Sequence, residues 1–175
     1  IFLCGQYLPE LFFDYPQLNL LFGTAANGIP VQNFHSAYEQ VEELEGAAEV
    51  GRHQLFTAIC QTNSRGKEPK KCVLKKHVIS SSSSRQELKR AIHVMALASH
   101  PNVISLQGIA KESDTDGNDV YYLQMPLLNQ NLREWIESSQ GKRDTHIQEA
   151  KLSILRGILL GLVFLHGKQI LHRDI

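Results

Sequence analysis

A histidine, an arginine and an aspartate stand next to one another as His172, Arg173 and Asp174, in the stretch "ILHRDI". A positioned carboxylate can act as a catalytic base, because it accepts a proton from a reacting group. A surface loop with an ion pair contains the same residue types, however, and a tripeptide recurs by chance. Lys75 stands in "KKCVLKK", where the simplest interpretation is a solvated lysine on a strand. The elements around these residues must decide between the two interpretations.

The composition describes a globular protein without a strong overall charge. The chain has 175 residues, 42% of them hydrophobic, which is enough for one domain with a core. Its 18 Lys and Arg residues balance 18 Asp and Glu residues, so we expect neither nucleic acid nor an anionic membrane as a partner. The three cysteines are far apart, which disfavours a disulfide framework and a zinc site and predicts a reducing, cytoplasmic setting.

The longest apolar stretch is "ILRGILLGLVFL", residues 154–165, and Arg156 interrupts it. It is shorter than the ~20 residues that span a bilayer, so it predicts a buried helix and no membrane segment. We expect no signal peptide, because the chain begins with Ile and no basic residue precedes its first apolar stretch. Both ends resemble cuts in a longer sequence, which leaves a membrane anchor elsewhere in the protein open.

The first half of the chain predicts strands around one helix. The capping-box spacing of Ser84 and Glu87 predicts that this helix starts at Ser84, and the Pro of "HPN" (100–102) predicts its end. Strands are predicted on either side, in "YEQVEEL" (38–44), "QLFTAICQT" (54–62), "KCVLKKHVI" (71–79), "VISLQGIA" (103–110) and "VYYLQM" (120–125). The pattern indicates an α+β fold, in which a small antiparallel sheet packs against a single helix.

The second half of the chain has a different character. "NLREWIESS" places Leu132, Trp135 and Ile136 on one helical face, and residues 147–166 form a long apolar helix pattern. Residues 1–37 match neither half. The chain therefore divides into an unassigned segment (1–37), a sheet-containing lobe (38–125) and the start of a helical lobe (126–175).

These segments follow one another in an informative order. The order comprises a strand lysine in "CVLK", a helix that ends in "HPNVISL", a strand "YYLQMPLL" that leads to "NLREWI", a helix that closes with "GLVFLH", and finally "ILHRDI". This order resembles the eukaryotic protein-kinase domain, from its first strand to the start of its catalytic loop. The resemblance covers about residues 38–175, so the chain is similar to a truncated kinase domain.

The resemblance implies roles for the polar residues. Such an enzyme transfers the γ-phosphoryl group of ATP to protein hydroxyl groups, and the protein neutralises charge, aligns the groups and accepts a proton. By their match to the family, Asp174 would orient the substrate hydroxyl and accept its proton, and Arg173 would anchor a phosphorylated activation loop. Lys75 would contact the α- and β-phosphates. The family's Mg²⁺ ligands would follow Ile175, so we expect no metal site within the chain.

The resemblance also implies an adenine site. Leu55 and Val73 would form its apolar roof, and Met125 matches the gatekeeper position. The backbones of Pro126 and Leu128 match the hinge groups that bond adenine, and a proline still offers the carbonyl for this role. ATP and a protein substrate are the implied partners, together with Mg²⁺ as cofactor.

The sequence departs from the family pattern at two places. The helix position that usually carries the glutamate partner of the strand lysine is Ala91, and Glu87 could replace it if the helix were shifted by about 5–6 Å. The phosphate-covering loop, residues 45–54, has ten residues and only two glycines, Gly46 and Gly51. The family expects a shorter loop with three glycines, because only glycine lets the backbone approach phosphates closely.

Two hypotheses follow. In the first, the parent protein is an active protein kinase, with Ser/Thr specificity favoured, and the 175-residue chain is itself inactive. In the second, the parent is a pseudokinase or scaffold with weak or no nucleotide binding, and Ala91 and the altered loop reflect lost catalysis. Only the first hypothesis predicts that the Asp174→Asn substitution abolishes function.

Overall fold

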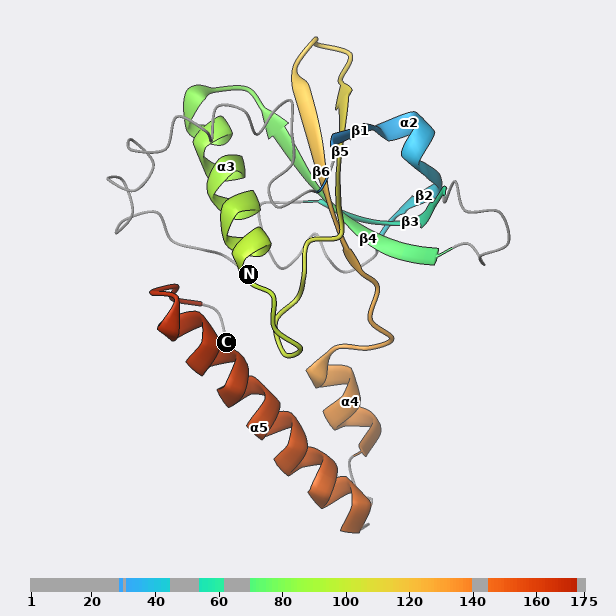
Figure 1. Ribbon diagram of the computed structural model, residues 1–175. Coiled ribbons are helices and arrows are strands. Elements are labelled where there is room, and N and C mark those ends of the chain that lie inside the picture. The colour runs from blue at the N-terminus through green and yellow to red at the C-terminus, as the bar shows by residue number, and fades with distance from the viewer. Residues whose placement is uncertain (1–28, 30, 45–53, 62–69, 140–144, 173–175) are drawn as a thin grey trace.

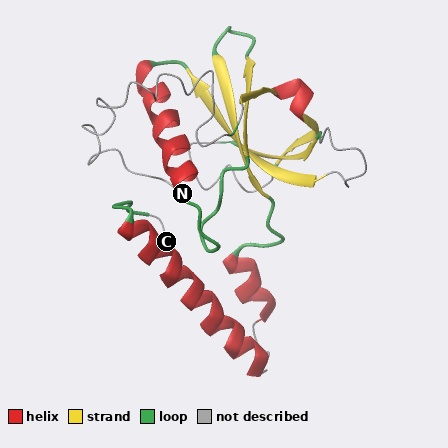
Figure 2. Cartoon of the chain, in the orientation of Figure 1, coloured by secondary structure: helices red, strands yellow, loops and turns green. Residues whose placement is uncertain are grey.

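The computed structural model describes residues 29, 31–44, 54–61, 70–139 and 145–172. A sheet with the strand order β1-β5-β6-β4-β3-β2 forms the upper part, and two helices lie below it (Figures 1 and 2). The elements are β1 (Val31–Asn33), α2 (Phe34–Ala37), β2 (Tyr38–Glu43), β3 (Leu55–Cys60), β4 (Lys70–Ile79), α3 (Ser82–Leu97), β5 (Gly108–Ser113), β6 (Asp119–Pro126), α4 (Leu132–Ser139) and α5 (Thr145–Gly167). The predicted α+β class, with a small sheet followed by helices, is confirmed.

The strands β2 to β6 form an antiparallel sheet, as predicted. The strand predicted at residues 103–110 begins later in the structure, because β5 covers Gly108–Ser113. Its pairing with β6 starts at Gly108, whose partner is Gln124, whereas the Val103 N–H donates to the His100 carbonyl in a turn. The hairpin that joins β5 to β6 is tight, and Gly117 adopts a φ of 79° there.

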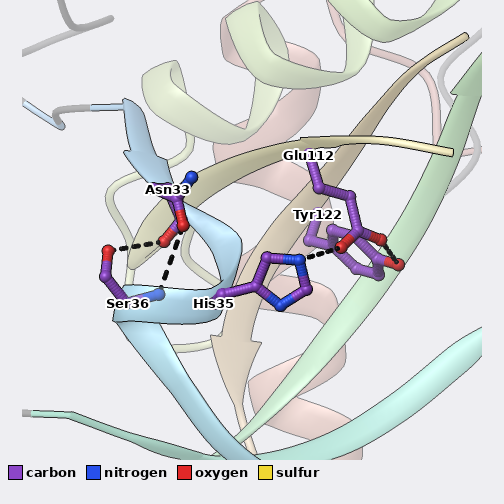
Figure 3. Close-up of polar contacts among 5 residues, drawn as sticks. All are labelled: Asn33, His35, Ser36, Glu112 and Tyr122. Carbon is purple, nitrogen blue, oxygen red and sulfur yellow. Dashed lines mark hydrogen bonds and ion pairs between the residues drawn. The ribbon is translucent and has the colours of Figure 1, made fainter. Parts of the chain in front are cut away.

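Residues 31–37, which the sequence left unassigned, join the sheet. β1 pairs in parallel with β5, so it covers what would otherwise be an open sheet edge. α2 then packs on one face of the sheet, where the Phe34 ring stacks on Tyr122 at 4.2 Å between centroids. Glu112 links α2 to the sheet. It accepts a 2.6 Å hydrogen bond from the Tyr122 hydroxyl, and its carboxylate lies 3.5 Å from His35 Nε2 on α2 (Figure 3).

Helix α3 packs on the opposite face of the sheet (Figure 1). It starts three residues earlier than predicted, because Ser81 and not Ser84 is the N-cap. The Ser81 hydroxyl accepts from the Ser84 N–H at 3.1 Å, and the Ser84 hydroxyl accepts from the Ser81 N–H at 3.0 Å, which completes a capping box. The helix ends at Leu97, just before "HPN", as predicted.

The turn after α3 attaches the sheet to α5. Gly157 and Gly161 lie one helical turn apart on α5 and face Asn102, and a Cβ placed on Gly161 would lie 2.9 Å from the Asn102 carbonyl oxygen. His100 stacks on Phe164 beside this contact, with 4.9 Å between ring centroids. The two glycines therefore allow the turn to approach the helix backbone.

The prediction that the apolar helix is buried is wrong for most of α5. Among the described residues, only Gly161 and Leu165 of this helix are buried. Its exposed side includes Leu152, Leu155, Leu159, Leu160 and Val163. By length and composition alone α5 could also cross a membrane, with a mean hydropathy of 1.5, but core helices of soluble proteins share this property. The absence of a membrane segment thus stays a prediction.

The contact at Gly161 predicts a specific loss of stability. The Gly161→Ala substitution places a methyl group against the Asn102 backbone, so we expect unfolding free energy to fall by about 1–3 kcal/mol. Gly167→Ala is the matched control, because no atom of the described residues lies within 4 Å of a Cβ at Gly167. Urea unfolding of both variants measures the difference, and equal stabilities would contradict this account of the close approach.

Candidate functional site

The candidate site lies on the face of the sheet that α3 covers. Side chains directly opposite each other in a ladder point to the same face. Leu55 pairs with Lys75, and Lys75 pairs with Leu123 on its other side. Val73 pairs with Met125 in the same way. The structure therefore brings the predicted roof residues, the strand lysine and the gatekeeper together on one face.

Lys75 is half-buried on this face. Burial lowers the pKa of its ammonium group below the usual value, and the negative charge of Glu87 raises it by a smaller amount. The charged form of Lys75 thus pays a desolvation cost that a nearby anion offsets. A half-buried cation under an apolar sheet is suited to binding an anionic ligand such as a phosphate group.

The helix position that faces Lys75 in the family has no carboxylate here. Ala91 is partly buried against the core between α3 and the sheet, together with Met125. Glu87 lies one turn earlier on α3 and is exposed. Its charge nevertheless acts on Lys75, so the chain supplies an anion from a neighbouring turn of the same helix. Glu87 is the alternative partner that the sequence analysis named.

The predicted hinge residues lie at the end of β6 and just after it. Pro126 is the last residue of β6 and pairs with Cys72, and Leu128 is 66% exposed in the connection that follows. The connection ends where α4 begins. Asn131 and Glu134 cap that helix reciprocally, because the Glu134 N–H donates to Asn131 Oδ1 at 2.9 Å and the Asn131 N–H donates to Glu134 Oε2 at 3.0 Å. The hinge backbone is thus fixed at both ends.

Part of the predicted site lies outside the described residues. Arg173, Asp174 and the loop at residues 45–53 belong to this part, so their roles stay predictions. His172 is described, and it lines a cavity of about 340 Å³ between the turn after α3 and the helices. The other lining residues are Asn102, Val103, Ile104, Leu132, Ile158, Gly161, Leu162 and Leu165.

No set of metal ligands occurs among the residues that the structure describes, since no three His, Cys, Asp or Glu side chains gather there. The described part of the site therefore offers a cation for phosphate groups but no site for Mg²⁺. Two further residues, Thr57 and Leu123, lie on this face, where they pair with Val73 and Lys75, and no sequence motif marks them. Side chains two residues apart in a strand point to the same face, so the positions of Leu55 and Met125 predict that Thr57 and Leu123 lie on this face as well.

Comparison with known proteins agrees with this arrangement. The protein kinase domain family matches residues 56–175, which is more than half of the chain. The chain therefore belongs to the protein kinase domain family, as the sequence motifs indicated.

Three relatives show which kinases the chain is similar to. It is 31% identical over 129 residues to a tobacco protein named mitogen-activated protein kinase homolog NTF6, covering 72% of this chain and 33% of that protein. Mitogen-activated protein kinase 13 of Arabidopsis thaliana is 30% identical, covering 72% of this chain and 34% of that protein. Serine/threonine-protein kinase PLK4 of Drosophila grimshawi is 27% identical, covering 84% and 18%. The chain thus spans about a third of the length of the two plant relatives.

The charge interaction between Glu87 and Lys75 predicts an effect on nucleotide affinity. The Glu87→Gln substitution removes the negative charge that acts on Lys75, so we expect ATP to bind about 2- to 5-fold more weakly, which is the size of effect that a partly exposed charge pair has. Equilibrium titration with a fluorescent ATP analogue measures the affinity. Glu137→Gln on α4 is the matched control, because this exposed glutamate lies on another helix.

A second variant tests the geometry of this pair. Ala91→Glu in the Glu87→Gln background returns a carboxylate to the usual helix position, and we expect it to restore affinity. The account is contradicted if Glu87→Gln binds ATP as tightly as the unmodified chain does.

Proposed function

We propose that the protein that carries this chain is an ATP-dependent Ser/Thr protein kinase. The single observation that supports this proposal most strongly is the position of Lys75. It is a half-buried lysine on an apolar sheet face, between Leu55 and Leu123. Family membership supports a nucleotide-binding function for that face, because protein kinases bind ATP with a strand lysine.

The proposed nucleotide site uses the described residues in two ways. The side chains of Leu55, Val73 and Met125 would cover the adenine ring, since apolar surface favours a planar ring that leaves water. The carbonyl of Pro126 and the backbone of Leu128 would form hydrogen bonds with its polar edge. Lys75 would neutralise the α- and β-phosphates, and Glu87 would keep the ammonium group pointed at them.

The proposed chemistry needs one further group. Asp174 would hold the hydroxyl group of the protein substrate by a hydrogen bond and accept its proton as the oxygen attacks the γ-phosphorus. Arg173 would anchor an activation loop. Mg²⁺ supplies charge neutralisation in this family, but the described residues do not provide its ligands, so no step of the proposed reaction is assigned to the metal.

The relatives favour a class of substrate. The Drosophila grimshawi protein is named a serine/threonine-protein kinase, and two plant relatives are named mitogen-activated protein kinases. We therefore propose Ser or Thr hydroxyl groups of proteins as the acceptors. The scattered cysteines support a cytoplasmic location.

A pseudokinase or scaffold is the second candidate function. Ala91 favours it, because the ion pair that stabilises the active arrangement in the family lacks its usual carboxylate. Such a protein would bind nucleotide weakly or not at all, and its function would not depend on Asp174.

The Asp174→Asn substitution separates the two functions. We expect it to lower phosphoryl transfer to a protein substrate by at least about 100-fold, because it removes the proton acceptor, while ATP binding stays unchanged. Incorporation of radioactive phosphate by the full-length protein measures the rate. Asp116→Asn in the hairpin between β5 and β6 is the matched control. If the full-length protein transfers no phosphate at all, or transfers it equally well after the Asp174→Asn substitution, the enzyme proposal is wrong.

A further inference from the structure

The segment that precedes β2 passes around the β5 edge of the sheet. β1 lies beside β5 (Figure 1), and its Val31 packs against the core under α3. Phe34 of α2 packs against the core on the other face, and the Ala37 carbonyl accepts a 2.8 Å hydrogen bond from the Gln61 N–H just after β3. Residues 31–38 therefore contact both faces of the sheet, although they precede the part of the chain that matches the kinase family.

This segment ends in a buried tyrosine that is bonded to β6. Tyr38 is 6% exposed, and its hydroxyl donates a 2.9 Å hydrogen bond to Gln124 Oε1. Burial is the largest cause that raises the pKa of the Tyr38 hydroxyl, so the group stays protonated and can donate at neutral pH. The hydrogen bond thus ties the segment before β2 to the strand that leads into the hinge.

The Gln124 side chain lies across a glycine of the neighbouring strand. Gly108 pairs with Gln124 in the ladder, and a Cβ placed on Gly108 would lie 2.6 Å from Gln124 Oε1. This distance is too short for a non-bonded contact, so the side chain can reach Tyr38 in this position only because residue 108 is a glycine. The Gln124 carbonyl also accepts a 2.8 Å hydrogen bond from the Gln107 N–H. Gln124 is therefore held by its side chain and by its backbone.

Gln124 is the last residue of β6 that has a ladder partner on each side. It pairs with Leu74 of β4 and with Gly108 of β5. Among the described residues, Met125 and Pro126 pair with β4 alone, so their position depends on how firmly Gln124 is anchored. Side chains alternate along a strand, so Gln124 faces the core under α2 whereas Met125 faces the candidate nucleotide site.

We propose that Tyr38 and Gln124 are positioning residues for Met125, so that residues 31–38 fix the gatekeeper side of the nucleotide site from the opposite face of the sheet. The inference rests on the proposed function, because Met125 contacts a ligand only if ATP binds under its face. Tyr38 belongs to the core on the other face and acts through β6. Loss of its hydrogen bond frees the Gln124 side chain and leaves the end of β6 with one anchor fewer.

NMR spectroscopy of isotope-labelled methionine methyl groups tests this positioning without a nucleotide. The chain has two methionines, Met95 on α3 and Met125 on β6, and the Met95→Leu variant assigns their signals. We expect Tyr38→Phe, which removes only the hydroxyl group, to shift or broaden the Met125 signal and to leave the Met95 signal nearly unchanged. An unchanged Met125 signal would overturn the proposal, whether or not the chain binds ATP.

Two further variants separate this hydrogen bond from a general loosening of the sheet. Gly108→Ala places a methyl group where the flexible end of the Gln124 side chain lies, so we expect it to reproduce the effect of Tyr38→Phe. The double variant should add little to either single change, because both remove the same interaction. Tyr122→Phe is the matched control, because it removes another bonded tyrosine hydroxyl on the same face of β6. An equal response of Met125 to this control would contradict the assigned roles.

Nucleotide affinity measures the consequence for the proposed site. In a titration with a fluorescent ATP analogue, we expect Tyr38→Phe to weaken binding by about 2- to 5-fold, an effect that the loss of one hydrogen bond can have. A loss of stability in urea with unchanged affinity would show a purely structural role and overturn the proposal. If the unmodified chain binds no ATP while Met125 still responds to Tyr38→Phe, the proposed function is wrong and the positioning of Met125 is supported.

Discussion

The alternation of side chains along β4 is the constraint on which the other features depend. β4 is a ten-residue strand with a partner on each side, so its side chains alternate between the two faces of the sheet. Cys72 and Leu74 belong to the core under α2, whereas Ile79 belongs to the core under α3. Lys75 falls on the α3 face by the same alternation. A shift of the register by one residue would exchange the cores and turn this lysine away from the candidate site.

A second contact holds the helical part against the sheet. The turn at residues 100–103 packs on α5, and the two glycines of α5 make room for Asn102. Val94 of α3 and Ala98, the residue after the helix, form a small core with Leu165 and Ile170. Helix α3, which carries Glu87, is therefore packed at its end against the segment that leads to His172.

Much of this arrangement could be predicted from the sequence. The antiparallel strands and the end of α3 before "HPN" follow from alternation and from the proline, and the family motifs identify Lys75. The start of α3 could not be fixed in the same way. Residues 80–84 are all serines, so several hydroxyl groups offer the same cap and only the folded chain selects Ser81. β1 has only three residues, too few for a pattern, and it forms because an edge of the sheet is available. The action of Glu87 on Lys75 depends on the placement of α3, which no local signal encodes.

The most direct measurement is the labelling of lysines by an ATP derivative that carries a reactive acyl group on its terminal phosphate. Such a probe acylates a lysine that contacts the bound phosphates. Lys70, Lys71 and Lys76 stand near Lys75 in the same strand and serve as internal controls. The account predicts that Lys75 is labelled selectively and that excess ATP protects it. Equal labelling of all four lysines, or labelling that ATP does not suppress, would contradict the placement of a nucleotide under this face of the sheet.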